Sequence, residues 1–416
     1  MEKIRVSAAT RNRFGLVLVV LGIVFVFATA QAEGAGFQNP PQGAAASAQA
    51  GAFVAQADDA TAITHNPAGL TQLSGTSVLL APTFIYPSTK FYAPGGQTEK
   101  TKEALHILPN LYFATDLNKK NWRFGLGITT PFGQSTEWSK DGFFKYYATF
   151  SEMKLIDVNP TVAYQVNPRF SLGLGLNYYN SNLTLKAQDD YGAYGPFPDG
   201  SHKMAVDGEG YGYNLGFLYK PAKKHSIGGA FRSGFSIKHT GHFSMTDIPL
   251  PLGGPDFSAP ASIKMNFPNM ASLGYAYRPN KKWKIEVDLE WIGWSSLENL
   301  TVEPTPPLPP EIAKDWKDTL SPRIGAEFRP DANWKLWAGY VYLPTSIPDR
   351  TFDPSLPDAN AHIFGLGAGW EKKNFTLALS QELSFPEDRK IAEGGPFDGT
   401  YKSFNLITTL NIQYNF

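Results

Sequence analysis

The C-terminal segment of the chain, residues 405–416, alternates apolar and polar side chains and ends in an aromatic residue. Because successive side chains of a β-strand point to opposite faces, one face is apolar and the other carries amide and hydroxyl groups. Leu406, Leu410, Ile412, Tyr414 and Phe416 lie on the first face, and Asn405, Thr409, Asn411, Gln413 and Asn415 lie on the second. A sandwich strand also alternates in this way. A terminal Phe after such a strand is typical of the closing strand of a barrel with lipid outside and a polar lumen.

The N-terminus has the order of a secretion signal. Basic residues come first, then the uncharged and mostly apolar run Phe14–Phe27, then the small residues Ala28–Ala32. This order predicts a cleaved signal peptide over residues 1–32, with cleavage after Ala30 as the alternative. A membrane-anchoring helix is the competing interpretation, but a span needs about 20 apolar residues and this run is shorter.

The composition excludes several classes of protein. The chain has no cysteine, which excludes disulfides and thiolate metal sites and suits passage through an oxidising periplasm. Its 37 basic and 37 acidic residues balance, so nothing indicates nucleic-acid binding. The seven histidines are scattered, and no serine-nucleophile elbow is present. We therefore expect no metal, no cofactor and no enzymatic activity.

Two kinds of connector alternate along the chain. One kind is short and rich in Lys, Asn, Pro and Asp; the other is long and rich in Gly and Pro. The short kind comprises 117–121, 166–169, 220–224, 278–282, 329–333 and 371–374, and the long kind comprises 131–150, 187–201, 247–260, 303–316 and 345–358. An outer-membrane barrel has short periplasmic turns and longer external loops, whereas a soluble sandwich has no reason to sort its loops in this way.

The segments between these connectors predict an all-β membrane protein with about fourteen antiparallel transmembrane strands. The expected strands are 77–87, 103–117, 122–130, 151–166, 169–186, 205–220, 225–243, 261–278, 282–297, 317–329, 334–344, 359–370, 375–386 and 400–416. Within them, Ile285, Val287 and Leu289 alternate with Glu286 and Asp288. Carboxylates cannot face lipid, so we expect these side chains to face a water-filled lumen.

The segment before the first strand, residues 33–75, is rich in small side chains, especially over Gly43–Ala50. A flexible linker is one interpretation. The other is a hatch of small helices packed inside the barrel, because a barrel of this width must be filled or leave a channel. We expect the hatch, with the barrel wall over residues 76–416.

Several short motifs occur in a fixed order along the chain. They are Asp58-Asp59-Ala60 followed by Asn66-Pro67-Ala68, then Thr130-Pro131-Phe132-Gly133, Lys145-Tyr146-Tyr147-Ala148, Asn159-Pro160-Thr161, Phe231-Arg232-Ser233, Trp291-Ile292-Gly293-Trp294 and Pro348-Asp349-Arg350. This ordered set resembles the FadL/TodX family of outer-membrane transporters of long-chain fatty acids and hydrocarbons.

The resemblance implies a fourteen-strand barrel closed by the hatch and passive uptake across the bacterial outer membrane. Ligand would be caught in an external apolar groove, pass to a pocket near the start of the hatch, and leave sideways through a gap at a kinked third strand. It implies a hydrophobic small-molecule ligand and contact with outer-membrane lipid and detergent; we expect a monomer. A general aqueous porin and a structural or adhesive barrel are the alternatives.

Candidate site residues follow from the resemblance and from residue type. Asn66, Pro67 and Ala68 are expected to form a hatch gate against the kinked strand, or else a helix-ending turn. Gly125 and Gly127 are expected kink points, or else small lumen-facing residues, and Thr130 and Pro131 end the regular pairing of that strand. For ligand binding we expect a set of loop aromatics, or else a headgroup-level belt. We also expect two cations for a fatty-acid carboxylate, or else two solvated or ion-paired lysines. These residues are Phe143, Phe144, Tyr146, Tyr147, Phe150, Lys186 and Lys317.

Overall fold

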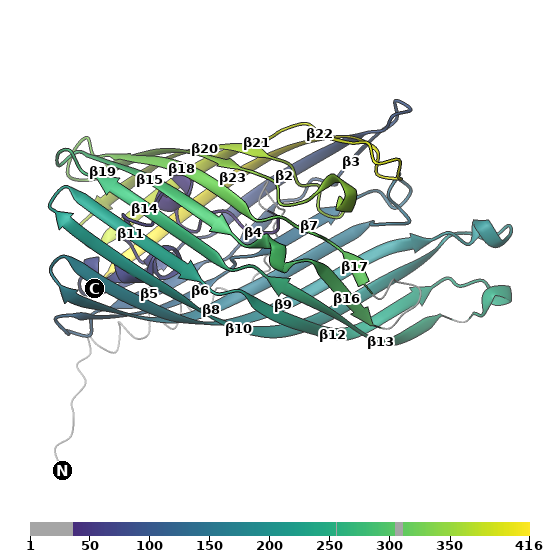
Figure 1. Cartoon of the computed structure of the whole chain (residues 1–416), viewed down its shortest axis with the longest axis horizontal. Helices are drawn as coiled ribbons and strands as arrows, with labels where there is room; N and C mark the ends of the chain where they lie inside the picture. Colours follow the sequence, from purple (N-terminus) through teal and green to yellow (C-terminus); the bar gives the residue numbers. More distant parts are fainter. Residues whose placement is uncertain (1–35, 255, 304–310) are drawn as a thin grey trace, which may run out of the picture.

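The computed structural model describes residues 36–254, 256–303 and 311–416, so the expected signal peptide lies outside the described residues. These residues form a closed barrel of fourteen antiparallel wall strands around a small helical segment. Figure 1 shows short turns at one end of the barrel and longer loops at the other. The described helices include none that is long and apolar enough to cross a membrane.

Several wall strands are interrupted and carry two labels. In order around the wall, the strands are β1 (Thr76–Leu80) with β2 (Thr83–Tyr92), β4 (His106–Leu108) with β5 (Leu111–Thr115), β6 (Trp122–Thr129) with β7 (Gly133–Glu137), β8 (Phe150–Asn167), β9 (Phe170–Asp189), β10 (Gly200–Ala222), β11 (His225–Arg232) with β12 (Phe235–Thr246), β13 (Phe257–Phe267) with β14 (Met270–Tyr277), β15 (Trp283–Ile292) with β16 (Asn299–Glu303), β17 (Glu311–Ala313) with β18 (Thr319–Phe328), β19 (Trp334–Leu343), β20 (Ala361–Lys372), β21 (Phe375–Pro386) and β23 (Gly399–Asn415). The short strands β3 (Thr98–Lys100) and β22 (Arg389–Ile391) extend the wall by pairing with β2 and β23.

The ends of the chain close the barrel. Val78 of β1 pairs with Tyr414 of β23, and Phe84 of β2 pairs with Thr408, so the wall has no free edge here. Closure satisfies the backbone groups that lipid cannot. Each predicted strand overlaps a wall strand of the structure. The predicted and observed strands differ most in their lengths. β10 spans 23 residues, about twice what a crossing needs, because it continues beyond the membrane.

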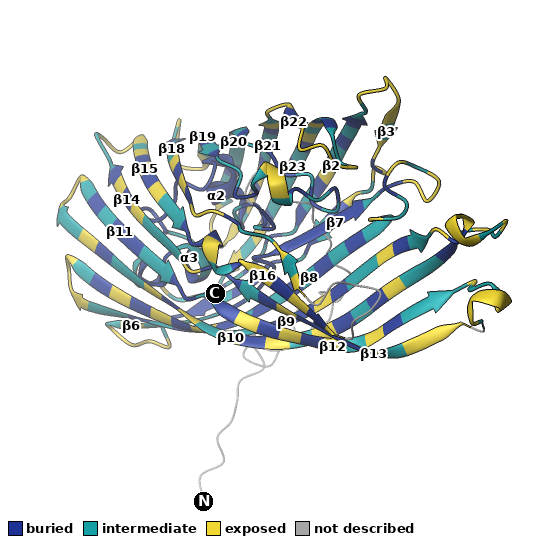
Figure 2. Cartoon of the chain, turned by 45° about the vertical axis from the view of Figure 1, so that its right-hand side comes forward, coloured by how far each residue is buried: buried dark blue, intermediate teal, exposed yellow. Residues whose placement is uncertain are grey.

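The two faces of the wall have opposite chemistry, as the alternation predicted. Leu289 is 44% exposed, whereas its neighbour Asp288 is 5% exposed. At the C-terminus, Tyr414 faces outward and Asn411 is buried. Figure 2 shows buried and exposed residues alternating along the strands. The apolar outer face suits lipid, and the inner face suits a polar lumen.

The start of the described chain lies inside the barrel. It contains three short helices, α2 (Ala44–Ala48), α3 (Ala62–His65) and the 3₁₀-helix η1 (Pro67–Gln72). α2 packs against β19, β20 and β21, and η1 packs against β8, β9 and β10. We call this segment, residues 36–75, the hatch. Its small side chains let several turns of chain fit within the lumen.

Glycines of the wall provide the surface on which the hatch lies. A Cβ atom added to Gly339 of β19 would lie 2.2 Å from the backbone of Gln49, and one added to Gly365 of β20 would lie 2.6 Å from the carbonyl oxygen of Ala48. Such distances are closer than van der Waals contact, so only glycine allows the hatch backbone to lie this close to the wall. Gly339 and Gly365 therefore face the lumen.

Gly339→Val is expected to displace the hatch while the barrel still forms, because overpacking at this contact costs about 1–3 kcal/mol. Hydrogen exchange of the hatch amides should become about tenfold faster or more, measured by mass spectrometry in detergent. Gly95→Val is the matched control, since no atom lies within 4 Å of the added Cβ. Equal hatch exchange in the two variants would show that the glycine contact does not hold the hatch.

Candidate functional site

The third wall strand is interrupted between β6 and β7. Thr129 of β6 pairs with Asp157 of β8, and Gly133 of β7 pairs with Lys154. Three residues of the third strand, 130–132, therefore face two residues of β8, and this extra residue is a bulge that bends the strand. We call residues 130–133 the kink.

The kink also ends the pairing between the second and third wall strands. β5 pairs with β6 up to Leu111 and Ile128. Beyond this point, β4 pairs with β2 and β7 pairs with β8, and the described strands show no pairing of β4 with β7. The wall therefore has a seam in its hydrogen-bond ladder beside the kink.

The first hatch residues, 36–42, bind the kink from inside; we call them the strap. Gln38 of the strap forms an isolated antiparallel bridge with Phe132. The hydrogen bonds run from Asn39 N to Pro131 O (3.0 Å), from Gly133 N to Phe37 O (2.9 Å) and from Asn39 Nδ2 to Thr130 O (2.8 Å). The strap thus satisfies kink groups that would otherwise have bonded to a neighbouring wall strand.

The side chain of Phe37 fills an aromatic cage above the hatch. Four rings surround it: the ring centroids lie 5.8 Å away for Phe132, 5.5 Å for Phe267, 4.7 Å for Trp294 and 5.3 Å for Trp316. We call these four residues the cage. Phe132 belongs to the kink, so one wall of the cage is the kink itself.

The cage is continuous with a cluster of buried apolar side chains inside the barrel, which we call the apolar upper lumen and which departs from the polar inner face seen elsewhere. Tyr179 and Phe235 stack at 3.7 Å between centroids, and Phe235 stacks on Phe267 of the cage at 4.5 Å. The same buried cluster continues through Met153, Leu155, Leu183, Met204, Val206, Ile237, Phe243, Ile263, Met265, Leu300 and Val302. A hydrophobic molecule in this part of the lumen would be shielded from water.

A cavity of about 110 Å³, lined by both charged and apolar side chains, lies beside the strap and the rest of the hatch. Arg232 and Arg323 line it, together with Asp288, Glu290 and His65. Arg232 pairs with Asp157 at 2.8 Å and Arg323 pairs with Glu290. Buried charges are tolerated when they are paired in this way.

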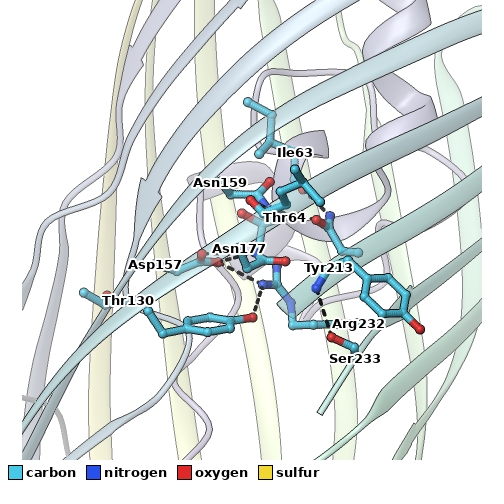
Figure 3. A network of polar contacts seen from close by, with 12 residues as sticks. Ile63, Thr64, Thr130, Asp157, Asn159, Asn177, Tyr213, Arg232 and Ser233 are labelled. Atoms are coloured by element: carbon cyan, nitrogen blue, oxygen red, sulfur yellow. Dashed lines mark hydrogen bonds and ion pairs between the residues drawn. The ribbon is translucent and has the colours of Figure 1, made fainter. Parts of the chain in front are cut away.

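Figure 3 shows the network around Arg232, which connects four wall strands with the hatch. Asn177 donates to Asp157 at 2.8 Å, and Asp157 accepts from Arg232. Beside it, Asn159 Nδ2 donates to Asn214 Oδ1 at 2.8 Å, and Asn214 Nδ2 donates to the carbonyl oxygen of Ile63 in α3 at 3.0 Å. The network therefore ties the position of α3 to β8, β9, β10 and β11.

Carboxylates of β15 hold the hatch backbone. Asp288 Oδ2 accepts from the amide nitrogens of Phe53 (2.9 Å) and Val54 (3.0 Å), and Glu286 Oε1 accepts from that of Ala55 (2.6 Å). Charge-assisted bonds of this kind are stronger than neutral ones. The row of carboxylates predicted to face the lumen thus anchors the hatch.

The Asn66-Pro67-Ala68 segment lies against β9 and β10 rather than against the kinked strand. Asn66 Nδ2 donates to the carbonyl oxygens of Val54 (2.8 Å) and Phe217 (2.9 Å), and Asn66 Oδ1 accepts from Ala68 N (3.2 Å). Asn66 also caps η1, so the turn interpretation accounts for its side chain. The side chain of Asn66 is therefore bonded to the hatch and to β10, and its expected role as a hatch gate stays a prediction.

The hatch contact with the third strand comes from Ile63 instead. A Cβ atom on Gly125 would lie 2.7 Å from Ile63 Cδ1, and one on Gly127 would lie 3.0 Å from Ile63 Cγ2. Both glycines belong to the regularly paired part of β6, so they are lumen-facing contact residues and not kink points. Thr130 and Pro131 lie in the kink itself.

The loop aromatics do not form one exposed surface. Phe144 is fully buried against Phe91, Trp138 and Tyr401, so it cannot line an open groove. Phe143 and Tyr147 are 41% and 54% exposed. The remaining aromatics each have a polar partner: Tyr146 donates to Asp199 at 2.9 Å, and Lys186 Nζ lies 4.9 Å from the ring centroid of Phe150.

The two candidate cations lie in different hollows. Lys186 lines one with Lys100, Lys102, Trp138 and Phe150. Lys317 lines another, which is polar and includes Asp349, Arg350 and Arg389. The structure therefore does not bring Lys317 together with the loop aromatics.

Sequence reasoning missed Phe37, although a signal for it exists. It is the one bulky side chain in the run 33–52 of small and polar residues. Trp294 and Trp316 belong to segments already quoted or singled out, but their meeting around Phe37 depends on connections across the whole barrel. A periodic pattern of residue types does not predict a contact between residues this far apart in the chain.

The comparisons agree with this architecture. Residues 25–416 match the family model described as outer membrane protein transport protein (OMPP1/FadL/TodX). The chain belongs to this family. It is therefore a protein of the bacterial outer membrane.

Relatives and solved structures extend the match. A long-chain fatty acid transport protein of Escherichia coli O6:H1 is 23% identical over 366 residues, covering 79% of this chain and 80% of the relative. The structure of a Pseudomonas aeruginosa FadL homologue has a TM-score of 0.82 at 20% identity, covering 92% of this chain and 100% of that one. The Pseudomonas putida toluene transporter TodX has a TM-score of 0.72 at 17% identity, covering 91% and 99%. These structures support the fold.

Asn66→Ala is expected to loosen the hatch without unfolding the barrel. The substitution leaves two buried carbonyl oxygens and one amide without their partner, and each such group costs about 1–3 kcal/mol. Hydrogen exchange should accelerate around residues 54 and 66–68, with unchanged heat-modifiable migration of the barrel on gels. Asn333→Ala, in an exposed turn, is the control. Unchanged exchange in Asn66→Ala would contradict this role.

His65 makes hatch docking pH-dependent. Its Nε2 lies 2.9 Å from the carbonyl oxygen of Gln42, and burial lowers its pKa to about 4 from the ordinary value of 6.5. Between these values His65 binds more protons in the undocked hatch than in the docked one, so the contribution of His65 to docking weakens as pH falls. From pH 7 to pH 5, the docking free energy that His65 contributes falls by about 2 kcal/mol by linkage.

This dependence is measurable as hatch hydrogen exchange at pH 7 and pH 5, after correction for intrinsic exchange rates. His65→Gln keeps a neutral donor for Gln42 and should remove the extra loosening at pH 5. An equal pH effect in the wild type and the variant would exclude His65 as its source.

Proposed function

We propose that this chain carries hydrophobic small molecules, fatty acids or hydrocarbons, passively across the outer membrane. The ligand enters the apolar upper lumen, replaces Phe37 in the cage, and leaves sideways at the kink into the membrane. The observation that carries the proposal is the position of Phe37. It fills the cage while the adjoining backbone is bonded to the kink.

The energetics favour such a route without an energy source. A hydrophobic molecule gains about 0.8 kcal/mol for each CH₂ group buried in an apolar environment. The ring of Phe37 must leave the cage for the ligand to enter, so the ligand has to bury at least as much apolar surface as the ring does. Because the strap is bonded to the kink, displacement of Phe37 pulls on the bonds that hold the kink inward.

The relatives support the ligand class. Named relatives include long-chain fatty acid transport proteins, and the structures of similar fold include toluene transporters and a monoaromatic hydrocarbon channel. Both groups of ligand are hydrophobic, which matches the apolar cluster of the upper lumen. The hatch and strap that occupy this lumen argue against an open aqueous porin.

The remaining parts of the proposal concern capture and chain organisation. We assign first capture to the exposed rings Phe143 and Tyr147, with Phe150 and Lys186 beside them, and not to Phe144. Residues 1–32 would be the signal peptide, 33–75 the hatch and 76–416 the barrel. The protein would act as a monomer embedded in outer-membrane lipid, and detergent would replace that lipid on extraction.

Deletion of Pro131 tests the lateral route. Removing one of the three kink residues that face two residues of β8 lets the third strand pair continuously, which closes the seam. Uptake of a radiolabelled long-chain fatty acid or of toluene by cells should fall at least tenfold, with normal barrel assembly. The reason is that a continuously paired third strand leaves no seam for lateral exit.

Pro131→Ala is the matched control, because it keeps the number of residues in the kink. It should retain most of the uptake. Full uptake in the deletion variant, with a folded barrel, would rule out lateral exit at this seam. The uptake function itself would be contradicted by two results together. Both variants would take up ligand normally, and cells without the gene would grow normally on hydrophobic carbon sources.

A further inference from the structure

The cage contains two hydrogen-bond donors that have no acceptor. Trp294 is fully buried and Trp316 is 5% exposed, and their rings meet at 5.1 Å between centroids. The indole Nε1 atoms of both residues are buried and have no hydrogen-bond partner among the described residues. Indole nitrogen is a donor only, so each needs an oxygen or another acceptor.

Phe37, which occupies the cage, does not supply such an acceptor. Its ring lies edge-on to Trp294 at 4.7 Å and tilted to Trp316 at 5.3 Å, and it has no lone pair to offer. A buried donor without a partner costs about 1–3 kcal/mol. By contrast, the buried indole of Trp138 donates to the carbonyl oxygen of Pro354 at 2.8 Å, and that of Trp337 donates to Glu327 at 3.0 Å.

The two unpaired donors are therefore a property of the cage and not of buried tryptophans in this protein generally. They belong to different parts of the wall: Trp294 lies in the short 3₁₀-helix η4 (Trp294–Ser296), and Trp316 lies between β17 and β18. Both contact the ring that a ligand has to replace. A ligand with an oxygen acceptor would satisfy what Phe37 leaves unsatisfied.

The side chains around the cage determine whether a charged or a neutral acceptor is stable there. The four side chains of the cage are aromatic. A cation that contacts the same buried cluster, Arg232, donates to Tyr179 at 3.1 Å and is already paired with Asp157 at 2.8 Å. A carboxylate placed there would lose its hydration without gaining a cation. The free energy of that desolvation is far larger than the free energy gained from hydrogen bonds to two neutral donors. A hydroxyl, carbonyl, ester or protonated carboxyl oxygen loses less hydration and can accept from one or both indoles.

We propose that the cage selects hydrophobic molecules that carry an uncharged oxygen acceptor over plain hydrocarbons, through the indole N–H groups of Trp294 and Trp316. This inference rests on the proposed function and names the ligand class of the same site. The tail of the ligand would take the place of the Phe37 ring and extend into the apolar upper lumen.

The test compares ligands of equal chain length: decane, 1-decanol, methyl decanoate and decanoate. Binding to the full-length protein in nanodiscs is followed by titration at pH 8, with each affinity corrected for the partition of the ligand into empty nanodiscs. Decanol and methyl decanoate are expected to bind about tenfold more tightly than decane, as for one to two satisfied buried donors. Decanoate is expected to bind no better than decane.

The variant is Trp294→Phe with Trp316→Phe, which keeps both aromatic faces and removes both N–H groups. The ratio of decanol to decane affinity should fall to about one, and decane should still bind, which shows that the cage is folded. Trp334→Phe, an exposed tryptophan on the outer face, is the matched control and should keep the ratio. In ¹⁵N spectra of the wild type, decanol should shift the two cage indole resonances and decane should not.

Each other outcome overturns the inference. Equal affinities for decane and decanol in the wild type would show that the cage does not use its donors, while the uptake function would stand. Tightest binding of decanoate would show that a cation, and not the pair of indole donors, holds the head of the ligand. An unchanged ratio in the double variant would place the acceptor elsewhere, and no binding of any of the four ligands would contradict the proposed function itself.

Discussion

The pairing of the strap with the kink is the interaction on which the working parts of this protein depend. A barrel wall in lipid must satisfy its own backbone groups, and the extra residue at 130–132 breaks the ladder that does so. The strap replaces part of that ladder from inside, through Asn39 and the carbonyl oxygen of Phe37, and Asn110 Oδ1 accepts from Thr130 N at 3.3 Å. The seam in the wall and the strap inside the lumen are therefore one structural unit. A change in the kink affects the strap, and a change in the strap affects the kink.

The rest of the hatch is held much more firmly than the strap. Wall glycines such as Gly339 bring its backbone into direct contact with the strands, and Asp288 and Glu286 accept from three consecutive amide nitrogens. This division has a functional consequence. The proposed route assigns displacement by ligand to the strap, through Phe37, while the rest of the hatch stays in the lumen.

The lumen is divided by chemistry as well as by position. Paired charges around Arg232 and Arg323 line the cavity beside the hatch, whereas the cage and the strands above it are apolar. Pro131 of the kink lines this cavity and Phe132 belongs to the apolar cluster, so the kink lies where the two regions meet.

The amino-acid sequence by itself determined the barrel. Alternation such as Ile285, Val287 and Leu289 against Glu286 and Asp288 assigns each side chain to lipid or lumen, and turn composition separates the strands, because both depend on residues adjacent in the chain. The lumen-filling segment was also foreseeable from its small side chains. Only the tertiary structure decided the site. Phe37 meets Trp294 and Trp316 across more than 250 residues of sequence, Asn66 lies on β10 and not on the third strand, and Phe144 is buried, because curvature and closure of the wall, which no local pattern encodes, set these contacts.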